Sequence, residues 1–152
     1  MQSTRVVEGC GRHSEVPDAY LLVLALRNVR RAADMALRHL VTAKARDQLR
    51  AALDEFETRL PGAKEARDVI EHFDDYSGGV GDQQQPAIRQ RDSRVPDEQL
   101  AQQYRIDFEH VVNDPARSLL HVGPHIVDLT AAGRAASQLV HEMWLAAKTE
   151  DG

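Results

Sequence analysis

Three side chains whose types could carry out chemistry lie close together in the sequence. Arg67 is followed after four intervening residues by His72, and Tyr76 lies four positions further on, within the run ARDVIEHFDDY. A histidine can take up or release a proton near neutral pH, and an arginine can stabilise negative charge that develops beside it. These residue types therefore suit general acid–base chemistry next to a stabilised anion.

The spacing resembles the RX4-6H motif of HEPN-domain proteins, small helical bundles that often serve as metal-independent ribonucleases in toxin systems. The resemblance implies that His72 handles the proton of the attacking 2′-hydroxyl and that Arg67 stabilises charge on the phosphate, commonly in a cleft between two protomers. It also implies that Tyr76 supports this site. The residue after the arginine is often asparagine in the family, whereas it is Asp68 here.

The same residues also fit a structural role. Arg67 precedes Glu71 by four positions, so the two can form an ion pair on one helix. His72 would then border the core beside Phe73. On a single helix, Arg67 and His72 stand roughly 140° apart, and acidic neighbours such as Glu71 would repel a phosphate. We therefore place the structural interpretation first and keep the ribonuclease as the alternative.

Two other groups of residues have the spacing of metal ligands. Asp68, His72 and Asp75 are spaced i, i+4 and i+7, so they share one face of a helix. Cys10 and His13 form one further pair near the N-terminus. A firm metal site needs ligands from a second element and residues that orient them, and the sequence identifies neither. We therefore expect no metal site.

Three histidines, His110, His121 and His125, cluster in a segment with strand-like alternation. Solvated strand histidines are the first interpretation, and a zinc site or a pH-dependent contact is the alternative. The glycine-rich residues 78–81 follow a helix, whereas a phosphate-binding loop follows a strand, so they predict a helix cap and a loop. We expect no cofactor.

Apolar residues recur at helical spacing in four segments and at alternating positions in one. These patterns predict a mainly α (α+β) fold, in which a single domain over residues 17–150 forms a four-helix bundle with a β-hairpin inserted before the C-terminal helix. The expected elements are a flexible arm over residues 1–16, helices over 17–40, 49–60 and 66–76, a long polar loop at about 77–96, a β-hairpin at about 104–128 and a last helix capped by Thr130.

The composition is that of a folded cytoplasmic protein. The chain has 152 residues, is 42% hydrophobic and carries a net charge of -5. A chain of this kind can bury a core, and its acidity argues against broad attraction to nucleic acid. The single cysteine, Cys10, suits a reducing compartment. No apolar run approaches the roughly 20 residues that span a bilayer, so we expect no membrane association.

Charge is distributed unevenly along the chain. Basic residues dominate from Arg27 to Arg50, and acidic residues dominate from Asp54 to Asp75. If these segments form neighbouring helices, their charges can compensate each other.

No nucleophile–base pair or cofactor motif stands out in the sequence. The first hypothesis is therefore a small interaction or regulatory domain that self-associates, or binds another protein, through apolar surface of the last helix and the hairpin. The alternative is an HEPN-like ribonuclease that uses Arg67, His72 and Tyr76 and binds RNA. Whether the protein is an enzyme is left open.

Overall fold

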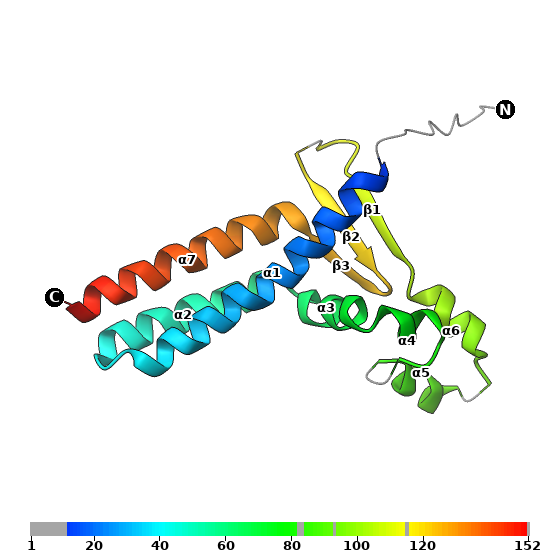
Figure 1. Ribbon diagram of the computed structural model, residues 1–152, viewed down its shortest axis with the longest axis horizontal. Coiled ribbons are helices and arrows are strands. Elements are labelled where there is room, and N and C mark those ends of the chain that lie inside the picture. The colour runs from blue at the N-terminus through cyan, green and yellow to red at the C-terminus, as the bar shows by residue number, and fades with distance from the viewer. Residues whose placement is uncertain (1–11, 82–83, 93, 115, 152) are drawn as a thin grey trace.

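The computed structural model describes residues 12–81, 84–92, 94–114 and 116–151. It has the predicted class, because it is mainly helical with a small antiparallel sheet ahead of the C-terminal helix (Figure 1). In the described residues the elements are α1 (Arg12–His39), α2 (Ala43–Arg59), α3 (Ala63–Glu71), α4 (Phe73–Ser77), α5 (Gln85–Arg91), α6 (Asp97–Gln103), β1 (Ile106–His110), β2 (Ser118–Val122), β3 (His125–Asp128) and α7 (Leu129–Asp151).

Three long helices form the body of the molecule. α1 and α7 run in the same direction, and α2 runs the opposite way beside both (Figure 1). Each helix turns an apolar stripe inward at spacings of three and four residues, which is the pattern that places side chains on one face. Burying one leucine of these stripes contributes about 2 kcal/mol. The buried stripe residues include Val23, Leu26 and Ala33 of α1, Leu49, Leu53 and Phe56 of α2, and Ala132, Ala135, Leu139 and Ala146 of α7.

The turn between α1 and α2 is fastened to the end of α7. The carboxylate of Glu150 accepts the backbone N–H groups of Val41 and Thr42 at 2.8 and 2.9 Å. Hydrogen bonds from the Thr42 hydroxyl and then from these N–H groups lower the pKa of Glu150. The stabilisation of the fold by the ionised Glu150 carboxylate is therefore fully present above the ordinary pKa of a glutamate. It is lost as the pH falls through the lowered pKa of Glu150.

The sheet has the antiparallel order β1-β2-β3, with β2 in the middle. Leu120 of β2 is paired with Phe108 on one side and with Val127 on the other. Leu120, Val122 and Val127 are buried, so the sheet covers one end of the helical body. The predicted hairpin is thus extended by a third strand, because the chain turns at Gly123, where φ is +58°, and pairs again.

The helices differ from the sequence prediction in several respects. α1 begins at Arg12, so Pro17 lies inside the helix and the predicted arm overlaps it; residues 1–11 of that arm lie outside the described residues. The predicted polar loop contains α5, which has a proline in its first turn. α7 begins two residues earlier than expected, since Asp128 rather than Thr130 accepts the N–H of Ala131.

The third predicted helix is divided at His72 into α3 and α4. In an unbroken helix, Asp68 and Tyr76 would lie about 12 Å apart along the axis, too far for the hydrogen bond that they make. The break brings them together. α3 packs against β3 and α1, and in the described residues the body has three long helices instead of the four that were expected.

α4 ends in the cap that the glycines predicted. The N–H of Gly79 donates to the carbonyl of Tyr76, and the N–H of Val80 donates to that of Asp75 at 2.9 Å, the pattern of a Schellman motif. Gly79 has a φ of +79°, and a Cβ there would lie 2.4 Å from the carbonyl oxygen of Asp97. This position therefore needs glycine for two reasons, its positive backbone angle and its close contact with α6.

We expect Gly79→Ala to lower the free energy of unfolding by about 1–3 kcal/mol, because alanine is strained at positive φ and collides with α6. Urea denaturation would measure this change. The matched control is Gly133→Ala within α7, where nothing lies within 4 Å of an added Cβ and alanine favours the helix. The control should raise stability by up to about 1 kcal/mol, and equal effects of the two changes would contradict this account.

Candidate functional site

Arg67, the first of the three predicted catalytic residues, lies on α3 beside a cavity. Its Nε atom is 3.5 Å from Oε2 of Glu71, so the predicted pair is present. The same Nε is buried and has no hydrogen-bond partner. A buried N–H group without an acceptor costs free energy, and the residue that carries it lines the cavity.

His72 lies on the surface at the junction of α3 and α4. The sequence placed it at the border of the core, but its side chain is exposed. It does not line the cavity beside Arg67, and no hydrogen bond or ion pair involves its ring in the part of the chain that the structure describes. The structure thus shows no contact that joins His72 to Arg67 within one chain.

Tyr76 is part of the core, with only 1% of its surface exposed. Its hydroxyl donates to Oδ2 of the buried Asp68 at 2.7 Å, and its ring lies 4.8 Å from that of Tyr104. Burial, and then the hydrogen bond to Asp68, raise the pKa of Tyr76 well above that of a free tyrosine. The hydroxyl therefore remains protonated and serves as a donor to the carboxylate.

The residues with metal-ligand spacing do not assemble into a site. Asp68 is directed to Tyr76, whereas His72 and Asp75 are exposed. In the described ranges, no group of three or more histidine, cysteine or carboxylate side chains could hold a metal ion. Cys10 lies outside the described residues, as does the side chain of His13.

The three histidines of the sheet have separate partners. Nε2 of His121 is 2.8 Å from Glu109, and Nδ1 of His110 is 3.2 Å from the hydroxyl of Ser118. The third, His125, is half-buried, and its Nε2 lies 2.6 Å from the side-chain oxygen of Gln84. Burial lowers the pKa of His125, so its neutral form is favoured there.

A cavity of about 550 Å³ lies between α1, the end of α2 and the first turn of α3. Its volume is within the range typical of small-molecule sites. Apolar side chains and charged side chains both line it. The apolar ones include Val23, Leu26, Phe56, Leu60 and Pro61, the cationic ones are Arg27, Arg30, Arg31, Lys64 and Arg67, and the acidic ones are Asp34, Glu57 and Glu65.

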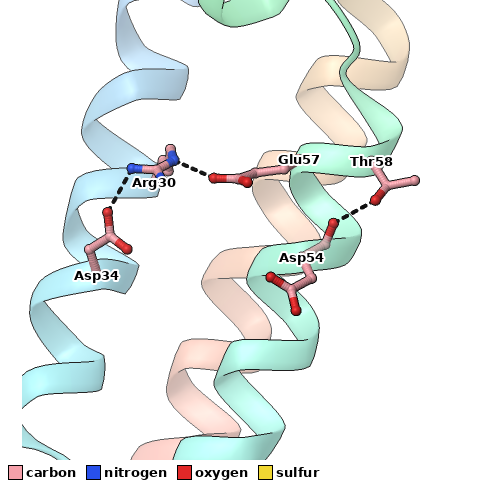
Figure 2. A network of polar contacts seen from close by, with 5 residues as sticks. All are labelled: Arg30, Asp34, Asp54, Glu57 and Thr58. Carbon is pink, nitrogen blue, oxygen red and sulfur yellow. Dashed lines mark hydrogen bonds and ion pairs between the residues drawn. The ribbon is translucent and has the colours of Figure 1, made fainter.

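Ion pairs cross this region between α1 and the two following helices. Arg30 pairs with Asp34 at 2.7 Å and with Glu57 at 2.5 Å (Figure 2), and Arg27 pairs with Glu71 at 2.6 Å. The predicted compensation between the basic and the acidic segment is therefore confirmed for Arg30 with Glu57 and for Arg27 with Glu71, whereas the Arg30–Asp34 pair lies within α1. They are largely exposed, so each contributes less than about 1 kcal/mol.

Apolar side chains are also exposed along α1 and α7. Arg30 of α1 bonds to α2, and Leu21 lies about 180° around the helix from it. On α7, Gln138 bonds to α2, and Val140 lies about 160° away. Because α1 and α7 contact each other, both stripes lie on one surface, the α1–α7 face. Its exposed residues are Leu21, Ala25, Ala32 and Met35 of α1 and Val140, Trp144 and Ala147 of α7.

Basic side chains border the α1–α7 face on both sides. Arg134, His141 and Lys148 follow one another at seven-residue intervals along α7, and Arg38 lies on α1. All four are exposed. The ammonium group of Lys148 lies 3.7 Å from the ring centroid of Trp144, and the ring of His141 is stacked against Trp144 at 6.0 Å.

Comparisons of the chain with family models, with curated proteins and with solved structures find no match. Among the described residues, no helix is both long and apolar enough to cross a membrane. The geometry of the chain itself therefore carries the functional argument.

Tyr76→Phe should lower the free energy of unfolding by about 1–3 kcal/mol, because it leaves the buried carboxylate of Asp68 without its donor. Tyr104→Phe is the matched control, since this neighbouring tyrosine is buried but its hydroxyl makes no hydrogen bond within the described residues. Urea denaturation should show the control close to wild type. Equal losses for both variants would mean that removing a hydroxyl from the core, and not the bond to Asp68, is the source.

Proposed function

We propose that this protein is a small cytoplasmic interaction domain, and that its α1–α7 face binds an acidic amphipathic helix of a partner protein. The observation that carries the proposal is a two-helix apolar surface bordered by basic side chains. Trp144 is 52% exposed and Val140 is 53% exposed on this surface. Clustered exposed apolar side chains with a polar border are typical of binding sites.

The shape of the body supports a helix as the occupant. α1 has 28 residues and α7 has 23, and they lie alongside each other in the same direction. A helix laid against both would complete a bundle with four long helices. This is the usual way in which an amphipathic helix is recognised, through apolar anchors spaced along one face.

The charges support an acidic partner over a second copy of this chain. Arg38 and Arg134 have no ion pair in the described residues, so their charges are available to carboxylates. A second copy that presented the same face would bring a second set of basic side chains toward the first. Like charges brought together oppose association, whereas glutamates on a partner helix would be attracted.

A synthetic 21-residue helix with leucines on one side and glutamates on both flanks would serve as the probe, measured by fluorescence anisotropy. We expect binding with a Kd of roughly 10 μM or below at low salt, weakened at least about tenfold at 0.5 M salt. Val140→Glu should abolish it. The control is Ile126→Glu, because Ile126 is equally exposed, at 54%, but lies on β3.

Equal affinity for a version of the probe with lysine in place of glutamate would overturn the assignment of an acidic partner. Light scattering of the wild-type chain tests whether a second copy of this chain occupies the α1–α7 face instead. A dimer that Val140→Glu dissociates would replace the partner helix with a second copy of this chain.

The ribonuclease is retained as a second proposal because of one specific observation. The ring of His72 is exposed and has no partner within the described residues, while Arg67, five positions earlier on α3, lines a cavity rich in cations. Two protomers could bring His72 of one chain to Arg67 of the other, as the resemblance to HEPN domains implies. Such an arrangement supplies both the proton transfer and the phosphate contact.

Metal-free cleavage of single-stranded RNA would test this second proposal, with EDTA present throughout. We expect His72→Ala to reduce the rate at least about a hundredfold and to leave the urea midpoint unchanged, since the exposed ring makes no contact that stabilises the fold. His121→Ala is the control histidine. Cleavage that survives His72→Ala would exclude His72 as the general acid–base group.

A further inference from the structure

We infer that the cavity between α1, α2 and α3 is a binding site for a small organic carboxylate with an apolar body. This site is separate from the α1–α7 face, because Arg27 and Arg30 line it from the flank of α1 that contacts α2 and α3. The inference goes beyond the proposed interaction function, and it shares Arg67 and the cavity with the ribonuclease proposal.

The apolar part of the cavity suits a hydrocarbon or aromatic group. Val23, Leu26 and Phe56 belong to the buried core and also line the cavity. A volume of about 550 Å³ accommodates a ligand of about ten to twenty non-hydrogen atoms. Removing the ligand's apolar surface from water would supply the non-directional part of the affinity.

Three cationic groups at the cavity have no acceptor in the protein. Arg31 and Lys64 line it without a hydrogen bond or an ion pair in the described ranges, and both are exposed to solvent. The buried Nε of Arg67 has no hydrogen-bond acceptor. Its nearest carboxylate, Glu71, is shared with Arg27, whose contact of 2.6 Å is much shorter than the 3.5 Å to Arg67. One carboxylate therefore serves two guanidinium groups, and an acceptor is missing.

The backbone adds donors at the same place. α3 begins at Ala63, and its N-cap, Gly62, provides no side-chain cap. The N–H of Ala63 already donates to the carbonyl of Leu60 at 3.2 Å, so the available donors are those of Lys64 and Glu65, which also line the cavity. Such first-turn N–H groups lack partners within the helix and favour an anion. This helix end reinforces the argument from the three side chains.

The balance of charge favours a single negative charge. Five cationic and three acidic side chains line the cavity, and Glu71 adjoins two of the cations. One positive charge is then in excess. A carboxylate neutralises it and matches the planar donors of an arginine, whereas a phosphate monoester carries about two negative charges and would exceed it.

The experiment uses the full chain and octanoate as the probe, with calorimetry for affinity and amide chemical shifts for location. We expect octanoate to bind with a Kd of roughly 1 mM or below and to shift amides of α1 and α3. The neutral 1-octanol should bind at least about tenfold more weakly, because it offers no charge to the unsatisfied cations.

Arg31→Gln combined with Lys64→Gln should weaken octanoate binding at least about tenfold. Arg38→Gln is the control, since it removes an exposed arginine from the same helix outside the cavity. The amide shifts of the wild-type chain provide a second readout if the double variant is unstable.

Four results would overturn the inference. Equal binding of octanol would show an apolar pocket without anion recognition. Tighter binding of octyl phosphate than of octanoate would show that the charge class is wrong. Shifts confined to the α1–α7 face, or an equal effect of Arg38→Gln, would show that octanoate binds outside the cavity.

Discussion

A carboxylate in a protein core needs a donor, and the donor for Asp68 is the hydroxyl of Tyr76. Since the two residues are eight positions apart, the helix must end between them, at His72. This break sets the course of the next segment. α4 packs on α6, Tyr76 stacks near Tyr104, and the backbone carbonyl of Tyr76 accepts the amide of the buried Gln85 at 3.0 Å. The two-part helix and the small helical cluster around α4 therefore follow from one buried polar contact.

Periodicity located the elements that are held by apolar stripes and missed those that are held by distant contacts. The stripe that contains Leu49 and Leu53 predicted most of α2, because every turn of that helix contributes to the core. The spacing between Ala66 and Tyr76 stays helical across His72, so no local signal marked the break. The ion pair of Arg67 with Glu71 was predictable, since both partners lie on one helix.

The cavity could not be predicted for the same reason. Arg31 and Lys64 are 33 positions apart, and only the packing of α3 against α1 places them around one space. In the sequence, each looks like an ordinary solvated cation. Compensation between the basic and the acidic segment was a sufficient explanation for their positions. What distinguishes them is that three nearby carboxylates, those of Asp34, Glu57 and Glu71, are already engaged with Arg27 or Arg30, which leaves Glu65 as the unpaired carboxylate of the lining in the described residues. That information exists only in three dimensions.

The hydrogen bonds that join Glu150 of α7 to the α1–α2 turn have an electrostatic consequence. α1 and α7 end side by side, so the negative poles of two helix dipoles meet at one end of the molecule. Arg38, His39 and Lys148 in the last turns oppose these poles. Glu150 would be repelled there, but it lies at the positive pole of α2 and binds the N–H groups that precede that helix. A carboxylate that is unfavourable at the end of its own helix thus acts as the cap of an oppositely directed neighbour.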